Sequence, residues 1–189
     1  MKVIQLHQEE KQLIMLAVEN NRQAQQQIYA KFSSKMLSVC RQYIKDIHHA
    51  EDVMITGFMK VFTNLKNFEH KGSFEGWIRR IMVYECIDFL RVKKNNFNHQ
   101  DIDDVTISEN ESVYEMEDFS VDDIQNMIDN LPDGYKMVFN LYAIEGYKHQ
   151  EIAEMLKISE GTSKSQLSNA RKLLQQQITD LKNKLNGTK

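Results

Sequence analysis

The chain has 189 residues, of which 41% are hydrophobic and 27% are charged, and its formal net charge is −3. These values are ordinary for a soluble globular protein and leave room for one large domain or two small ones. They exclude a membrane-spanning protein, because no apolar run approaches the roughly 20 residues that a span needs.

Two further features point to the cytoplasm. Charges interrupt the apolar stretch of the first 16 residues, so this stretch does not have the pattern of a secretory signal peptide. Cys40 and Cys86 both lie within apolar helical patterns, which is typical of reduced thiols in the core of a cytoplasmic protein.

Glycine and proline are scarce, with seven and one respectively. This scarcity predicts an all-α fold, because sheet-rich folds need many tight turns. It also leaves no Gly-rich loop to hold a nucleotide phosphate. His48 and His49 are adjacent and have no cysteine pair nearby, so they do not form a zinc-ligand pattern. We therefore expect no metal, no cofactor and no small-molecule substrate.

Charge is unevenly distributed along the chain. Residues 1–100 carry a net charge of +5, and residues 124–189 carry +2. Between them, residues 101–123 hold 10 acidic residues and no basic one. Like charges repel and bury little surface, so this stretch is predicted to be an extended or disordered linker. It would be either a solvated tether or a segment that lies in a basic channel of a partner.

Apolar residues spaced by three and four predict two helices in the first block, over 28–44 and 50–65. Glu51 and Asp52 are expected in the first turn of the second helix, where acidic groups suit the helix dipole. A polar break follows, and Ser73 is the predicted N-cap of the next helix.

That next helix, over 74–94, carries a mixed basic and aromatic strip. Arg80, Tyr84 and Arg91 fall within about 40° of one another on a helical projection, with Trp77 beside them. Such a strip suits single-stranded nucleic acid, because cations neutralise phosphates and exposed rings stack on unpaired bases. The alternative is that the two aromatic residues belong to the core and the arginines form a solvated edge.

The second block contains four predicted helices. The first covers 124–131, and the second begins at Pro132, a tolerated start, and ends at Gly146. The third covers 149–156, and Ser159 is the predicted N-cap of the fourth.

The last two helices have the spacing of a helix-turn-helix. A short turn at 157–158 joins them, and Ala153 is small enough for a close crossing. Leu167, Ala170 and Leu174 form the inner stripe of the fourth helix. Small, hydroxyl, amide and basic residues form its outer face: Gly161, Thr162, Ser165, Gln166, Ser168, Asn169 and Lys172. Such a face predicts contact with the major groove of DNA, the alternative being a plain solvated helix in a bundle.

Three stretches in this order resemble one family, the bacterial sigma factors of RNA polymerase of the small extracytoplasmic-function (ECF) type. They are AEDVMITGFMKVF (50–62), GSFEGWIRRIMVYECIDFLR (72–91) and the stretch from LPDG to RKLL (131–174). The resemblance covers roughly 20–185. It implies an alternative sigma factor, not an enzyme, that directs core polymerase to specific promoters and initiates transcription.

The resemblance also implies a division of labour. Residues 1–97 would be the region 2 domain, which binds the polymerase clamp helices and recognises and melts the −10 element. Residues 98–121 would be a flexible acidic linker that runs toward the polymerase active site and RNA exit channel. Residues 122–189 would be the region 4 helix-turn-helix domain, which binds the −35 element and the polymerase flap. An anti-sigma factor is a further possible partner.

Site residues follow from these patterns and the resemblance together. The predicted contacts with the −35 element are Ser159, Glu160, Gly161, Thr162, Lys164, Ser165, Gln166, Ser168, Asn169, Arg171 and Lys172. The predicted contacts with the −10 element are Phe68, Lys71, Ser73, Trp77, Arg80, Tyr84, Asp88 and Arg91. The predicted contacts with core polymerase are Glu51, Asp52, Ile55, Phe58 and Phe62.

The chain departs from the usual family pattern at a few positions. Ile55-Thr56 stands where Gln-Glu is common, and Tyr84 stands where an asparagine is usual. Lys157 occupies the usual glycine position of the helix-turn-helix turn, and Ser163 begins a run that is more often Val-Lys-Ser-Arg.

Three rival functions remain at the level of sequence. The first is a helix-turn-helix repressor or activator that acts without core polymerase and senses a ligand in its first block. The second is a helical adaptor that binds only proteins. The third, a helical enzyme, lacks a recognisable set of nucleophile, base and acid.

Overall fold

The computed structural model describes residues 2–96 and 119–186, and all the regular structure in these ranges is helical. In chain order the elements are α1 (Lys2–Val18), α2 (Arg22–Tyr43), α3 (Ile47–Asn64), η1 (Leu65–Asn67), α4 (Phe74–Asn96), α5 (Val121–Asp129), α6 (Asp133–Phe139), η2 (Asn140–Ile144), α7 (His149–Leu156) and α8 (Glu160–Asn186). The prediction of an all-α chain is confirmed for these residues.

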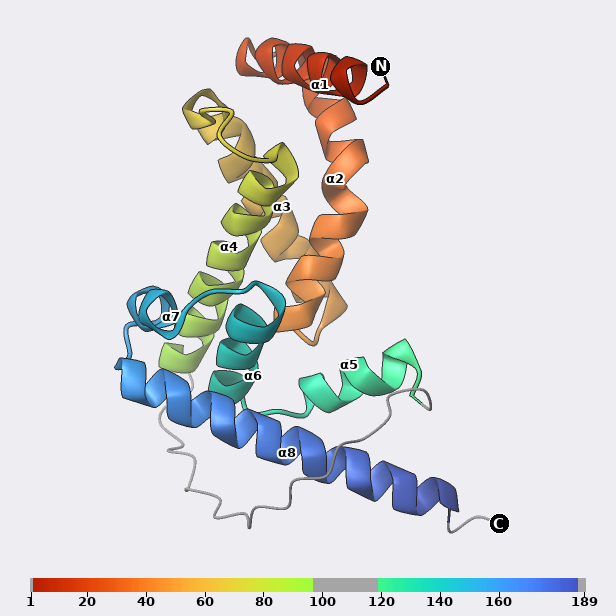
Figure 1. Ribbon diagram of the computed structural model, residues 1–189. Helices are drawn as coiled ribbons and strands as arrows, with labels where there is room; N and C mark the ends of the chain where they lie inside the picture. The colour runs from red at the N-terminus through yellow and green to blue at the C-terminus, as the bar shows by residue number, and fades with distance from the viewer. Residues whose placement is uncertain (1, 97–118, 187–189) are drawn as a thin grey trace. The chain divides into compact units, whose positions relative to one another are not determined.

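The chain divides into two compact units, one ending at Phe97 and the other beginning at Asn98. In the first unit α2, α3 and α4 pack against one another, and α1 packs on α2 (Figure 1). In the second unit α6 and α7 pack on the long helix α8, and α5 makes a smaller contact with it (Figure 1).

The start of α3 differs from the prediction. The helix begins at Ile47, and the carboxylate of Asp46 accepts a hydrogen bond from the His49 backbone N–H at 2.9 Å. That N–H, with a smaller contribution from the two nearby histidines, lowers the pKa of Asp46. The expectation that Glu51 and Asp52 lie in the first turn is wrong, because the helix begins three residues before Ala50. Both lie in the second turn, where the helix dipole is weak.

The core of the first unit is apolar and rich in aromatic side chains. Phe32 and Phe74 pack edge to face with ring centroids 5.7 Å apart, joining α2 to α4. Where α3 crosses α4, Gly57 leaves space for Met82, and a Cβ at that position would overlap the methionine sulfur. Gly57 therefore permits the close approach of the two helices that carry the predicted polymerase and −10 residues.

The core of the second unit is smaller and includes a buried ion pair. Leu131, Tyr135 and Ala170 form its apolar centre. Beside them the Lys136 ammonium lies 2.7 Å from the carboxylate of Asp129, and their side chains are 6% and 1% exposed. Replacing only one of the two residues would destabilise the fold, because the remaining charge would be buried without a partner.

The first helix of the second unit begins inside the predicted acidic stretch. Ser120 caps α5, and Ser120 and Asp123 form a reciprocal capping box. Residues 121–123, the last three of the acidic stretch, therefore form the first turn of a helix and are not extended, because the cap starts the helix there. The rest of the predicted linker, up to 118, lies outside the described residues.

The second helix of this unit changes its winding before it ends. It begins after Pro132 as α6, continues as the π-helical turn η2, and ends near Gly146, which has φ of 78°. The predicted start and end are thus confirmed. The sequence pattern did not indicate the π turn, which carries Tyr142.

Candidate nucleic-acid interface

The amino end of α8 is held by a serine cap. The Ser159 Oγ accepts a hydrogen bond from the Thr162 backbone N–H at 2.9 Å and lies 2.8 Å from the Thr162 Oγ1. Ser165 donates to the Thr162 carbonyl at 3.0 Å. Ser159 is therefore the N-cap that the sequence predicts, and the first turn is a defined, polar surface.

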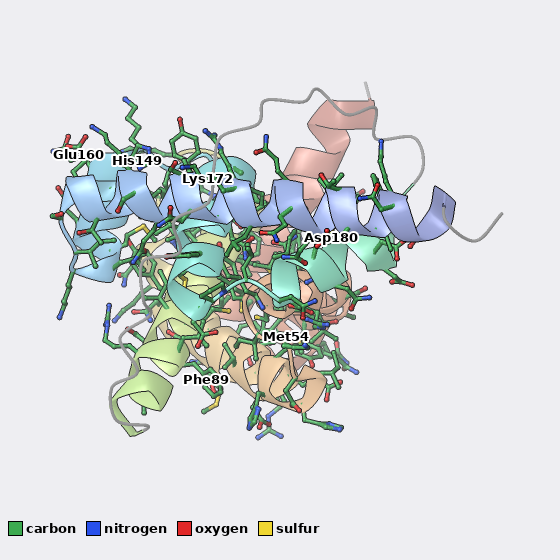
Figure 2. The ribbon with its side chains drawn as sticks, turned by 90° about the horizontal axis from the view of Figure 1, so that it is seen from below. Met54, Phe89, His149, Glu160, Lys172 and Asp180 are labelled. Carbon is green, nitrogen blue, oxygen red and sulfur yellow. The ribbon has the colours of Figure 1, made fainter. Side chains whose placement is uncertain are left out.

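The two faces of α8 separate packing from polar chemistry. Leu167 and Ala170 are 4% and 0% exposed and face the core, as predicted. The exposed residues of its first three turns include no large apolar side chain; they are Glu160, Gly161, Lys164, Ser165, Ser168 and Arg171. Figure 2 shows Glu160 at the start of this helix and Lys172 and Asp180 further along it. A face of this kind can bond phosphates and base edges.

Lys164 and Glu160 form an exposed ion pair one turn apart, with Nζ and Oε1 2.7 Å from each other. The hydrogen bond from Lys164 and its charge lower the pKa of Glu160. Both side chains are about half exposed, so each remains able to contact a ligand.

Some predicted −35 residues lie at the edge of this face. The Asn169 amide donates to the Tyr135 hydroxyl at 3.2 Å, which ties it to the core of the unit. Gln166 lies against Gly134, where an added Cβ would be 3.2 Å from the Gln166 amide nitrogen. Lys172 and Thr162 are half-buried. The exposed members of the predicted set therefore form a narrower stripe than the set itself.

The turn between α7 and α8 is tight and left-handed. Lys157 has φ of 57° and ψ of 45°, the conformation that favours glycine. The Ile158 backbone N–H donates to the Ala153 carbonyl at 3.1 Å, which closes the turn. Lys157 thus adopts a left-handed backbone conformation at some conformational cost.

The predicted strip on α4 lies on the surface of the first unit. Arg80, Tyr84 and Asp88 are exposed, and Arg91 is half-buried. The Arg80 guanidinium lies 5.9 Å from the centre of the Tyr84 ring, and Arg91 donates to Asp88 at 2.9 Å. The alternative that Tyr84 belongs to the core is wrong, because its side chain is 37% exposed.

The aromatic residues next to this strip have a different environment. Phe68 is 8% exposed and packs with Phe74 and Trp77 at ring distances of 5.1 and 5.5 Å. Trp77 is half-buried in the same cluster. For Trp77 the core alternative describes the environment better than exposure does. Phe68, predicted as a −10 contact, is buried in the same aromatic cluster.

The polar residues of that loop are accessible. Lys71 is exposed and pairs with Glu69 at 2.7 Å. Ser73 accepts a hydrogen bond from the Gly76 backbone N–H at 3.0 Å and is the N-cap that the sequence predicts for α4. Gly72, with φ of 93°, takes the left-handed conformation that turns the loop into the helix.

The predicted polymerase contacts on α3 include both exposed and buried residues. Glu51, Asp52 and Ile55 are exposed, the last at 49%. Phe58 is 2% exposed and packs edge to face on Tyr29, so it supports the surface from beneath and is not itself part of it. Phe62 is half-buried.

The sequence analysis missed one exposed apolar residue on this surface. Met59 is 67% exposed and lies one turn after Ile55. The i, i+4 spacing from Ile55 was a signal that could have identified it.

Residues 2–96 and 119–186 hold neither a metal-binding cluster nor a membrane-spanning helix. No group of three or more histidine, cysteine or acidic side chains there is arranged to hold a metal ion. No described helix is both long and apolar enough to cross a bilayer.

Comparisons with known proteins agree with this geometry. Residues 28–96 match the model of sigma-70 region 2, and residues 121–174 match the model of sigma-70 region 4. The chain is 29% identical to the ECF RNA polymerase sigma factor SigW of Bacillus subtilis strain 168, over 79% of this chain and 86% of SigW. It is 30% identical to the RNA polymerase sigma factor SigV of the same strain, over 72% of this chain and 80% of SigV.

A solved structure shares the fold. It is the sigma factor RpoE from Bartonella quintana in complex with the anti-sigma factor NepR, with a TM-score of 0.53 and 19% identity over 82% of this chain and 96% of that one. With both sigma-70 regions present in order and a relative at 30% identity, this chain belongs to the sigma-70 family as an ECF-type sigma factor, which directs RNA polymerase to promoters for transcription initiation.

Proposed function

We propose that the second unit binds the −35 element with the amino end of α8 in the major groove. The observation that carries this proposal is the separation of faces on α8. Gly161, Lys164 and Ser165 are exposed in its first turns, whereas Leu167 and Ala170 are buried on the other side. Free backbone N–H groups at a helix start attract phosphate, and hydroxyls and cations reach base edges and phosphates.

In the first unit, the exposed surface of α3 binds core polymerase. Ile55 and Met59 supply apolar area, and Glu51 and Asp52 supply charge at one end of it. Buried Phe58 holds this surface in shape from beneath. Apolar residues bordered by charged ones are the usual composition of a protein–protein contact.

On α4, the exposed strip binds the opened −10 element. Arg80 and Arg91 neutralise phosphates, and the Tyr84 ring offers a face for an unpaired base. Base stacking on an aromatic ring contributes about 1–3 kcal/mol. Lys71, in the loop before the helix, adds a further accessible cation.

Neither unit is strongly basic, which determines how the protein works. Binding of the free chain to DNA should be weak and sensitive to salt, because few phosphates are neutralised. Specificity then depends on both units acting together on the polymerase. We further propose that the protein acts in the cytoplasm and that the acidic segment 98–121 links the two units. We also propose that an anti-sigma factor can hold the chain inactive, since the Bartonella quintana protein forms a complex with one.

Run-off transcription with purified core polymerase tests the proposal. Lys164→Ala should weaken transcription on all promoters that have a −35 element, because it removes a phosphate contact. Thr162→Ala or Ser165→Ala should instead change the preferred −35 sequence. Gln176→Ala, an exposed change further along the same helix, is the matched control and should behave as wild type.

The same assay separates the rival functions. A repressor or activator would bind a palindromic site without polymerase, and an adaptor would give no transcription at all. Wild-type behaviour of all three α8 variants on promoters altered at −35 would contradict the placement of this helix.

A further inference from the structure

A polar contact lies on the buried side of α8, away from the face that is proposed to read DNA. Ser163 is 0% exposed, although it stands between exposed residues of α8. The Nδ1 of His149, at the start of α7, lies 2.9 Å from the Ser163 Oγ. Figure 2 shows His149 beside the amino-terminal part of α8.

His149 also makes a second contact, with a tyrosine ring. Its ring stacks on Tyr142 of η2, with centroids 4.6 Å apart and planes 22° from parallel. The Arg171 guanidinium lies 5.7 Å from the centre of that tyrosine ring. Ser163 and Arg171 are both on α8, so the series of contacts through His149 and Tyr142 begins and ends on the same helix.

These four side chains therefore hold α8 at two points. The two points are eight residues apart, which corresponds to about 12 Å along a helix axis. Between them lie Lys164, Ser165 and Ser168, the exposed residues of the proposed −35 surface. A helix that is fixed at two such points by elements outside it can neither roll nor tilt freely on its core.

We propose that His149 is a positioning residue for −35 recognition, acting through Ser163 on one side and through Tyr142 and Arg171 on the other. We call these four residues the clasp. The proposal rests on the proposed binding of the −35 element by α8. A hydrogen bond has a preferred distance and direction, so it fixes the rotation of the helix more narrowly than an apolar contact would. The stack on Tyr142 keeps the Arg171 cation in a fixed place at the edge of the surface.

The clasp predicts a different transcription defect from the one that a loss of folded protein would cause. A variant that only lowers the amount of folded protein reduces transcription from every promoter by a common factor. A variant that lets α8 roll reduces discrimination between the best −35 element and one altered at a single base, because base contacts depend on geometry more than phosphate contacts do. Discrimination is therefore the quantity to measure.

The experiment uses the full chain with core polymerase. It compares run-off transcription from two promoters that differ by one base in the −35 element. Wild-type protein must discriminate between them; if it does not, the proposed function fails before the clasp is tested. His149→Phe keeps a stacking ring but removes the hydrogen bond, and we expect it to lower discrimination about fivefold, the factor that one neutral hydrogen bond supplies. Ser163→Ala should lower it similarly, and the double variant should be no worse than the worse single variant.

Two further variants and a measurement of folding accompany this test. Gln176→Ala should discriminate as wild type does, and Tyr142→Leu should lose discrimination as His149→Phe does. Circular dichroism establishes that each variant is folded at the assay temperature; if His149→Phe is not, the smaller change Ser163→Ala carries the test. Unchanged discrimination in folded His149→Phe or Ser163→Ala, or losses that add in the double variant, would overturn the clasp while leaving the −35 proposal in place.

Discussion

The two units place their candidate functional residues differently with respect to their cores. On α8 the exposed polar face and the buried stripe of Leu167 and Ala170 lie on opposite sides of one helix. In the first unit, Phe58, Phe68 and Trp77 were predicted to be contacts, but they lie within the aromatic packing of the unit or at its edge. On α8 the residues that pack and the residues proposed to bind are different residues. In the first unit several residues predicted to bind also take part in packing.

This difference predicts how substitutions behave. In the first unit, a change at a predicted contact alters stability and binding together unless the residue is exposed. In the second unit, changes on the outer face of α8 alter binding with little effect on stability.

The largest effect is expected at Phe58. Phe58→Ala removes a side chain that is 2% exposed and packs on Tyr29, and it should lower the free energy of unfolding of the first unit by about 3–5 kcal/mol. Ile55→Ala, on the exposed surface of the same helix, should change stability by less than about 0.5 kcal/mol but weaken polymerase binding. Urea denaturation and a polymerase pull-down measure the two effects. Equal stabilities of the two variants would break the contrast.

The buried ion pair of the second unit gives the next largest effect. Lys136→Met leaves the Asp129 carboxylate without its partner ammonium and should cost about 3 kcal/mol. Changing both residues, as Lys136→Met with Asp129→Leu, should recover most of that loss, because an apolar pair needs no desolvation of charge. Thermal unfolding of wild type, the single variant and the double variant checks this. A double variant no more stable than the single would show that the pair is not the source of the cost.

The two helix caps provide a matched comparison between the units. Ser73 caps α4 and Ser159 caps α8, each by accepting a hydrogen bond from a backbone N–H within the first turn. Replacing either with alanine should cost about 1 kcal/mol of stability. Ser159→Ala should also weaken transcription that depends on −35, whereas Ser73→Ala should slow opening of the −10 element. Permanganate footprinting of opened thymines and transcription from promoters without a −35 element distinguish them. Identical promoter defects in both variants would count against separate roles for the units.

The smallest effect concerns the charge at the start of α8. Lys164 lowers the pKa of Glu160, so the ionised carboxylate contributes stability above its ordinary pKa, and that contribution is lost as the pH falls through the lowered value. Lys164→Ala should move the pKa of Glu160 up toward its ordinary value. The pH dependence that this variant removes lies in the acid range, because between about pH 6 and 8 the carboxylate is ionised in the folded and the unfolded chain alike and stability does not vary with pH through Glu160. Carbon-detected NMR titration of wild type and variant measures the shift, and an unchanged Glu160 pKa would show that the ion pair does not form in solution.

These contrasts also explain which features the sequence could predict. Helical periodicity identified the inner stripe of α8, because that stripe depends only on the angle between side chains on one helix. For Tyr84 of α4 it left both exposure and burial open, and the structure decides for exposure. Serine caps at Ser73 and Ser159 were predictable because their hydrogen bonds are local.

Features that depend on tertiary contacts were not predictable in this way. The burial of Phe58 depends on Tyr29 of a different helix, and the burial of Phe68 depends on how a loop folds over α4. The contact between His149 and Ser163 joins two helices through a turn whose left-handed lysine the sequence pattern does not indicate. Each depends on the angle at which elements pack, which periodicity does not specify.

The most direct test of the central claim is a DNA-cleavage map from the start of α8. Both cysteines, Cys40 and Cys86, are 0% exposed, so a single Ser165→Cys variant can be labelled selectively with an iron chelate that cleaves nearby DNA. In the complex with core polymerase on a promoter, cleavage should be confined to the −35 region. A Gln176→Cys label, further along α8, should cleave the same region less. Cleavage from position 165 that lies elsewhere on the promoter, or none from a transcriptionally active complex, would contradict the account.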